Sequence, residues 1–350
     1  MRRTGVMIEF KAIESASTFL DPRNGFSQST VDFQVRIDPL TGRTCHFSHF
    51  GALKAQKLDL PGYEKPEVKG FCPFCSDKRE KATPRFTPDI VPEGRLIRGE
   101  ACLIPNLFPY DIHSGVVIMT DDHVVGLSGF SKERLTDSFL LGLDFLRKID
   151  ALDPALPYHL MTWNYMPPSG GGLVHPHQQY FATKFPGNQF TDELKGSERF
   201  FKTYEKNYWH TLIETEMAGN ARYIGKVGQT HWITPFASMG LLGEIMCVFP
   251  DVFSIRDLTD ADMDDLVSGL LRVFRFYEGS GIVSFNASLS LGPAGQDHFC
   301  SFFRIVPRTF LNMRDFAPDL NFFQAVLSEP VCVVLPEDLC RDIKPYFNNQ

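Results

Sequence analysis

The sequence predicts an α+β protein built from two similar halves, each an antiparallel sheet with packed helices. The first reason is that residues 94–183 contain several runs rich in Val, Ile and Phe and, between them, one segment whose apolar residues recur at helical spacing. The second is that the same order of strand, helix, strand and strand recurs in residues 243–308. Finally, a chain of 350 residues with 43% hydrophobic content is long enough to bury two cores.

Composition and charge exclude several classes of partner. The formal net charge is −7 and the isoelectric point is near 5.8, which argues against a nucleic-acid partner because such proteins concentrate positive charge on one face. We find neither a signal-peptide core after Arg2 and Arg3 nor a run of about 18 apolar residues. The sequence therefore predicts a cytoplasmic protein with no membrane contact, whose eight cysteines are reduced.

The first ninety residues divide into three predicted segments. Residues 1–30 are mixed and polar, and we expect an extended arm without a core of its own, with regular structure beginning afterwards. Residues 31–50 alternate apolar and polar positions around the turn-forming residues 38–42, which indicates a hairpin. Residues 56–93 contain many prolines and charges, so we expect a long loop there that needs an anchor.

The two halves follow in order. In the first half we expect strands at residues 94–106 and 113–121, a helix at 131–152 capped by Ser131, and strands at 159–166 and 175–183. In the second half we expect a strand at 243–250, a helix at 258–279, and strands at 282–292 and 297–308. The repetition indicates an internal duplication, with halves at residues 31–190 and 191–350.

His175-Pro176-His177 carries the most chemical information. On a strand, residues i and i+2 point to the same face, so both imidazoles are expected on one side, and the proline stiffens the pair. Gly171 and Gly172 belong to a glycine run before the motif, which lets the backbone approach a phosphate closely. The alternative is a pair of structural histidines.

Around this motif, Gln179 stands two residues after His177, and Asn164 stands eleven residues before His175. Further segments of interest are 36–42, Cys72-Pro73-Phe74-Cys75, 106–109, 258–274 and the strand that contains His298. Together they resemble the galactose-1-phosphate uridylyltransferase branch of the histidine-triad superfamily, over most of residues 31–345. The resemblance implies two histidine-triad-like domains, of which the second is degenerate and lacks the paired histidines.

The resemblance also implies double-displacement nucleotidyl transfer. His177 would be the nucleophile, neutral and with one ring nitrogen held by a backbone carbonyl, and would form a covalent nucleotidyl-histidine. Gln179 would donate a hydrogen bond to the phosphoryl oxygen. Asn106, Phe108, Asn164, Gly171 and Gly172 would contact the substrate, although Asn106 and Phe108 equally suit a plain turn.

Cys72 and Cys75 have the spacing of metal ligands, but two thiolates need two further ligands. The resemblance supplies His123 and His175, which would complete a closed, structural zinc site that anchors the long loop. The alternatives are a buried reduced cysteine pair and, for His123, a solvated turn residue.

The expected substrates are a nucleotide-sugar and a sugar 1-phosphate or related phosphate, and the resemblance implies a homodimer. Two departures weaken galactose 1-phosphate as the acceptor: Gly172 replaces a serine, and Ala325 and Val331 replace a glutamate and a glutamine that hold the hexose in the family. One alternative is a phosphorylase or hydrolase of dinucleoside polyphosphates or nucleotide-sugars. Another is a zinc-stabilised nucleotide-binding module without catalysis.

Overall fold

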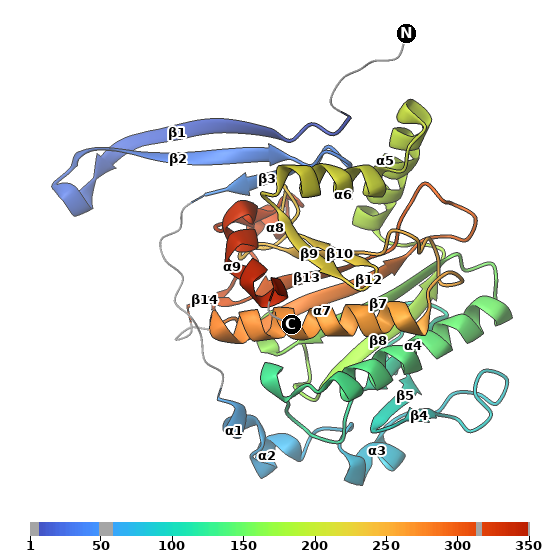
Figure 1. The fold of residues 1–350 in the computed structure, drawn as a ribbon. Coiled ribbons are helices and arrows are strands. Elements are labelled where there is room, and N and C mark those ends of the chain that lie inside the picture. Colours follow the sequence, from blue (N-terminus) through green and yellow to red (C-terminus); the bar gives the residue numbers. More distant parts are fainter. Residues whose placement is uncertain (1–6, 49–58, 313–316, 349–350) are drawn as a thin grey trace.

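The computed structural model describes residues 7–48, 59–312 and 317–348, and its centre is one antiparallel sheet (Figure 1). Within these residues the sheet has ten strands. From edge to edge they are β4 (Leu96–Arg98), β5 (Ala101–Pro105), β6 (His113–Ile118), β8 (His177–Thr183), β7 (Tyr158–Tyr165), β12 (Ser284–Leu291), β13 (Phe302–Arg308), β11 (Ile245–Val248), β10 (Thr230–Ile233) and β9 (Tyr223–Val227). The α+β class is confirmed.

The two halves meet where β7 pairs with β12 and are related by an approximate twofold axis at the pair Thr162–Ser288. On either side of this pair the strands follow in the same order, with a long helix between the third and fourth strands of each half. Thr162 also pairs with Gln179, whereas Ser288 pairs with Arg304. Arg304 therefore takes the place of Gln179 in the second half, and Phe302 takes the place of His177.

One face of the sheet is covered by α4 (Lys132–Leu152), α7 (Asp260–Gly279) and α9 (Pro336–Asn348), of which α4 and α7 lie side by side (Figure 1). The Ser131 hydroxyl accepts from a backbone amide at the start of α4, as predicted, and Thr259 caps α7. Tyr180 packs so closely on Gly142 of α4 that a Cβ there would lie 2.0 Å from the ring. These contacts form the main core.

The opposite face is covered unevenly. Helices α5 (Asn188–Tyr204) and α6 (Tyr208–Gly219) pack on the strands of the second half, where Trp209 stacks on Phe302. In the first half the same face carries a small cluster around Val116 that packs against Phe74. His177 and Gln179, on the same strand, are only partly buried there.

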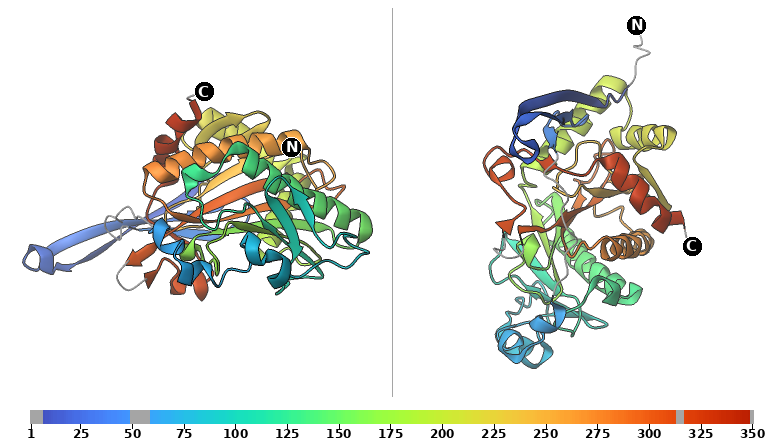
Figure 2. Two further views of the ribbon diagram at one scale, coloured as in Figure 1. Left: turned by 90° about the horizontal axis from the view of Figure 1, so that it is seen from below. Right: turned by 90° about the vertical axis from the view of Figure 1, so that its left-hand side faces the viewer.

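The N-terminal segment is more regular than the sequence predicts. β1 (Lys11–Asp21) and β2 (Ser27–Ile37), joined through the 3-10 turn η1 (Pro22–Asn24), form a hairpin that projects from the body (Figure 2). The expected hairpin is present where β2 pairs with β3 (Thr44–Phe47), and β16 (Val331–Cys332) adds a parallel strand. The expectation that regular structure begins after residue 30 is wrong, because strand pairing does not need the burial that sequence patterns reveal.

The segment expected to be one long loop contains short helices: α1 (Leu60–Tyr63), α2 (Pro66–Lys69) and α3 (Ser76–Ala82). Its first residues, and His49 of the predicted hairpin, lie outside the described residues. The remaining short elements are η2 (Leu127–Gly129), η3 (Pro167–Ser169), β14 (Phe310–Asn312), β15 (Ala317–Pro318) and α8 (Phe322–Ala325). None of the described helices combines the length and apolar character required to cross a membrane.

Candidate functional site

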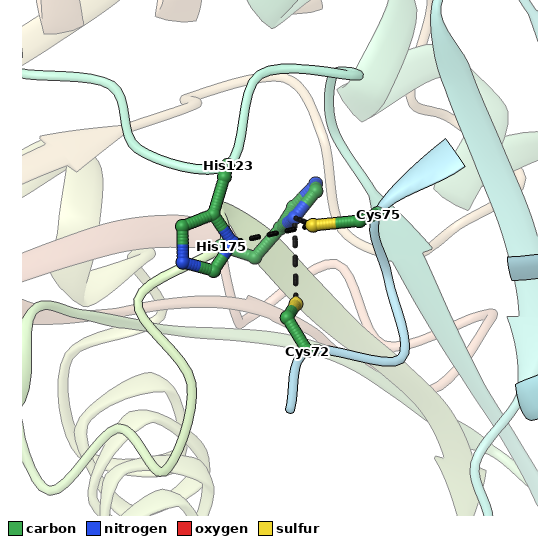
Figure 3. Close-up of side chains that lie close together, drawn as sticks. All are labelled: Cys72, Cys75, His123 and His175. Atoms are coloured by element: carbon green, nitrogen blue, oxygen red, sulfur yellow. Dashed lines mark hydrogen bonds between the residues drawn. The ribbon is translucent and has the colours of Figure 1, made fainter. Parts of the chain in front are cut away.

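Cys72, Cys75, His123 and His175 converge in one buried cluster (Figure 3). Their ligand atoms all lie within 4.8 Å of one another. The Sγ atom of Cys75 lies 3.4 Å from Nδ1 of His123, and that of Cys72 lies 3.6 Å from Nδ1 of His175. A tetrahedral zinc ion holds sulfur and nitrogen ligands about 3.5 Å apart, since the Zn–S and Zn–N bonds are about 2.3 and about 2.0 Å. The donor set therefore fits a tetrahedral metal.

The protonation of these four residues supports the same conclusion. Nε2 of His175 lies 2.9 Å from the carbonyl oxygen of Thr120 and donates to it, which leaves the Nδ1 lone pair facing the thiols. Burial lowers the pKa of His175 to about 4 and also lowers that of His123, so both rings are neutral. Burial, followed by the neighbouring Cys72, raises the pKa of Cys75 to about 11. A bound cation would make a thiolate at this position favourable.

Arg79 of α3 links the two loops that supply ligands. Its Nε donates to the carbonyl of Phe74 at 3.0 Å, and its Nη2 lies 2.8 Å from a carboxylate oxygen of Asp121. The first contact orders the turn between the two cysteines, and the second fixes the loop that carries His123. The side chain of Arg79 is mostly buried. Arg79 thus ties together the loop that carries the two cysteines and the loop that carries His123.

His177 stands directly after the cluster, at the first residue of β8. Its Nδ1 lies 2.8 Å from the carbonyl oxygen of His175, so Nδ1–H donates and the lone pair is on Nε2. Burial lowers the pKa of His177, and the bond to His175 opposes that shift. The sequence places both histidines on a strand, but the strand begins only at His177. The Phe74 ring nevertheless packs against both imidazoles, with centroids 6.0 and 5.3 Å apart.

Gln179 and the glycine loop flank His177. Gln179 shares its face of β8, while Gln178 and Tyr180 point to the helical layer and are fully buried. Gly170 has a φ of +82°, which favours glycine, and a Cβ on Gly172 would meet nothing within 4 Å. The loop therefore exposes its backbone. Gly171 lies against Asn164 across this loop, since a Cβ there would be 3.5 Å from the Asn164 carbonyl oxygen.

Asn164 is held by residues of the second half. The amide nitrogen Nδ2 of Asn286 lies 2.6 Å from Oδ1 of Asn164 and 3.0 Å from the carbonyl oxygen of Ser169. Nη1 of Arg308 donates to Oδ1 of Asn286 at 2.6 Å, and Asp319 binds Arg308 through both of its carboxylate oxygens. This chain of contacts directs the amide donors of Asn164 away from Asn286.

Asn106 and Phe108 lie in the turn between β5 and β6. The backbone amide of Phe108 donates to Oδ1 of Asn106 at 3.0 Å, which is the turn chemistry expected of an Asn at this position. The Phe108 side chain is 79% exposed. In the same turn, Tyr110 contacts Phe181, which lies two residues beyond Gln179 on the same face of β8. The turn therefore lies beside the part of β8 that follows His177 and Gln179.

No sequence motif identifies Arg79, Asn286 or Arg308 as site residues. Polar residues on strands and short helices have many roles, and their contacts here depend on strand register and loop packing. One signal was available: Asn286 lies on the strand predicted as the counterpart of the strand of Asn164, and the two residues pair directly.

No protein-family model matches the sequence. The chain is 28% identical over 317 residues to an uncharacterised protein of Archaeoglobus fulgidus, a match that covers 90% of this chain and 92% of that one. Among solved structures, it is similar to an ADP-glucose phosphorylase from Arabidopsis thaliana with bound ADP-glucose (TM-score 0.67, 18% identity, 89% of this chain and 98% of that one). It is also similar to a galT-like protein from the same plant (TM-score 0.68, 19% identity, with the same coverage).

A uridylyltransferase structure has a TM-score of 0.62 at 19% identity and covers 89% of this chain and 98% of that one. At such identities these likenesses concern the fold. The fold is that of the galactose-1-phosphate uridylyltransferase-like proteins, and the resemblance seen in the sequence is confirmed at that level.

Proposed function

We propose that the protein is a nucleotidyltransferase that moves a nucleoside monophosphate between two phosphate-bearing small molecules through His177. The observation that carries this proposal is the state of His177. Its Nδ1–H is bound to the His175 carbonyl, so the lone pair lies on Nε2. A neutral imidazole fixed in this tautomer is ready to act as a nucleophile.

In the first step, Nε2 of His177 attacks the α-phosphorus of the donor. A P–N bond forms, the bond from phosphorus to the bridging oxygen breaks, and the leaving phosphate keeps the electron pair. In the second step, a phosphate oxygen of the acceptor attacks the same phosphorus and the P–N bond breaks. Gln179 and Asn164 donate hydrogen bonds to the phosphoryl oxygens, and backbone amides near Gly171 and Gly172 bind phosphate.

We further propose zinc as the metal, held by Cys72, Cys75, His123 and His175, because two thiols and two neutral imidazoles at tetrahedral spacing suit this ion. When bound, zinc would supply structural cross-linking rather than a reactive group, because four protein ligands leave no open position. The chain positions His177 through the adjoining His175 carbonyl.

The donor we favour is a nucleotide-sugar, and the acceptor a sugar 1-phosphate or related phosphate. The ADP-glucose in the structure of the plant phosphorylase supports this donor class. That protein's name also favours a second candidate, phosphorolysis of a nucleotide-sugar with inorganic phosphate as acceptor. We propose that the rings of Phe108, Tyr110 and Phe181 stack on the nucleobase, because Phe108 and Tyr110 are exposed and Tyr110 contacts Phe181.

The test is intact mass spectrometry after brief incubation with UDP-, ADP- and GDP-sugars. We expect a nucleoside-monophosphate adduct on the wild type, and none on His177→Ala. The matched control is His298→Ala, which removes a partly buried histidine of the second half and should keep the adduct. Chasing the adduct with glucose 1-phosphate or with inorganic phosphate distinguishes transfer from phosphorolysis. Wild type without an adduct from any donor would contradict the covalent mechanism and favour a non-catalytic nucleotide-binding module.

A further inference from the structure

A groove of about 380 Å³ lies on the open face of the sheet and crosses the boundary between the two halves. Its floor consists of residues of β7, β12 and β13, and the start of α5 forms one wall. Asn164, for which we propose a contact with the phosphoryl group, is one of the residues that line it. The groove therefore begins at a residue of the proposed transfer site.

The strand order places this groove on one side of β8 and the proposed nucleobase site on the other. The turn that carries Phe108 joins β5 to β6, and β6 is one neighbour of β8. The other neighbour is β7, which is followed by β12 and β13. A donor with its nucleobase at the turn and its α-phosphorus at His177 therefore has the groove available for the group beyond the bridging oxygen.

The groove presents no unpaired charge. Within the described residues, the ionisable side chains that line it are Glu193 and Arg304, and these two form an ion pair at 2.8 Å. Arg304 also pairs with Glu244. The groove therefore gives no electrostatic attraction to a second charged group, and it suits an uncharged part of a substrate.

Two hydroxyl groups are available on the floor of the groove. Thr162 and Ser288 are paired directly across β7 and β12, and both are partly exposed. Neither hydroxyl forms a hydrogen bond with another residue in the described part of the chain. Thr162 precedes Asn164 by two residues on the same strand, so the hydroxyl pair lies about 7 Å from the proposed phosphate contact.

Apolar side chains lie beside these hydroxyls, and they include Leu160, Met239 and Val306. Such a mixture suits a sugar ring, whose hydroxyl groups exchange hydrogen bonds with Thr and Ser while its C–H faces contact apolar surface. We propose, resting on the proposed function, that the groove binds the polyhydroxylated group attached to the leaving phosphate and that Thr162 and Ser288 select it. The acceptor phosphate takes the place of the leaving phosphate in the second step, so the groove also receives the acceptor.

The experiment compares glucose 1-phosphate and galactose 1-phosphate with cyclohexyl phosphate, which keeps a six-membered ring and the phosphate but has no other hydroxyl groups. Affinity for the full-length protein is measured by isothermal titration calorimetry at pH 7.5 without a nucleotide donor, so that no transfer occurs. We expect at least one sugar phosphate to bind about tenfold more tightly than cyclohexyl phosphate, because several hydrogen bonds distinguish the two.

Thr162→Val and Ser288→Ala should each weaken binding of that sugar phosphate about threefold to tenfold and leave cyclohexyl phosphate unchanged. Thr162→Ser keeps a hydroxyl and should retain most of the affinity. The matched control is Ser17→Ala, which removes the hydroxyl of an exposed strand residue in the projecting hairpin and should change neither affinity. Thermal unfolding identifies any variant that fails to fold.

Cyclohexyl phosphate that binds as tightly as both sugar phosphates would overturn the proposal, whatever the variants do. Unchanged sugar phosphate affinity in both Thr162→Val and Ser288→Ala, or equal weakening of all the probes, would also overturn it. The adduct at His177 is measured separately. The expected preference without an adduct would refute nucleotidyl transfer and leave the groove assignment in place, whereas an adduct without the preference would refute the groove assignment alone.

Discussion

Asn286 should control catalysis by orienting Asn164, and two substitutions separate this role from a contribution to stability. In the wild type, Nδ2 of Asn286 donates to Oδ1 of Asn164, so the amide of Asn164 presents its own N–H groups elsewhere. Asn286→Ala removes this donor and the acceptor used by Arg308. Asn286→Asp keeps an acceptor for Arg308 but replaces the donor by a carboxylate oxygen.

The expected magnitudes follow from these contacts. Reversing the side-chain amide of Asn164 in the wild type would lose the hydrogen bond from Asn286 and would place the N–H groups of the two amides against each other. This reversal costs about 1–2 kcal/mol. Asn286→Ala removes this preference, so we expect transfer to slow about threefold to tenfold. Asn286→Asp reverses it, because the new carboxylate attracts the N–H groups of Asn164 and turns its oxygen towards the substrate phosphate. We therefore expect a loss of about tenfold to 100-fold.

The two variants should rank in the opposite order for stability: Asn286→Ala should lower the free energy of unfolding more than Asn286→Asp does. Arg308 retains a partner in Asn286→Asp, and its hydrogen bond to residue 286 becomes an ion pair. This gain offsets the lost donation to Asn164 and to the Ser169 carbonyl, so the unfolding free energy should stay near that of the wild type. Asn286→Ala leaves Arg308 Nη1 and Oδ1 of Asn164 without these bonds and should lose about 1–2 kcal/mol. The measurements are the first-turnover rate of adduct formation and urea unfolding. Wild-type transfer by Asn286→Asp would refute the orientation argument.

Three further outcomes are expected. Cys72→Ser should lower the zinc content, measured by elemental mass spectrometry, from about one ion per chain, and should lower the melting temperature by about 5–10 °C. The control Cys102→Ala changes a buried thiol outside the cluster and should keep the metal. Burial lowers the pKa of His159 from 6.5 to about 4, so its neutral form stabilises the fold above pH 6.5 and up to about 3 kcal/mol is lost as the pH falls towards 4. In urea unfolding, His159→Gln should therefore gain stability relative to the wild type between pH 6.5 and 4.5, and parallel pH profiles would contradict this reasoning. Light scattering should give about twice the 39.6 kDa chain mass, since strand β1 of the projecting hairpin is almost wholly exposed in one chain and a two-stranded ribbon is marginal alone. A monomer mass would contradict the proposed homodimer.

Elements with strong local signals could be predicted from the sequence. The helix that follows Ser131 and the one that follows Thr259 both combine a capping residue with apolar positions at helical spacing. The metal cluster could be predicted because Cys72 and Cys75 have the spacing of metal ligands and the resemblance added His123 and His175. Such features depend on residue type and short sequence separation, which a single sequence displays directly.

The parts that were missed depend on contacts between distant residues. The exposed strand β1 has no burial pattern, because pairing with β2 satisfies its backbone without a core. Helices α5 and α6 were not predicted, although they determine which half of the sheet stays open. The contact of Asn286 with Asn164 joins residues 122 positions apart, and it requires the register of β7 against β12.

The two halves of the sheet are covered unequally, and under the proposed function this leaves a single transfer site, in the first half. In the second half, Phe302 stands where His177 stands in the first, and Trp209 of α6 covers it. In the second half, a packed phenylalanine therefore occupies the position of the proposed nucleophile. It nevertheless supplies Asn286, which fixes Asn164 and the carbonyl of Ser169 beside the glycine loop. Because those contacts cross the β7–β12 boundary, separating the halves would remove the support of Asn164 even where the first half retained its metal cluster. The second half thus acts on the first through the positions of its polar side chains, and a fragment ending near residue 190 should transfer poorly although it contains every residue of the histidine motif.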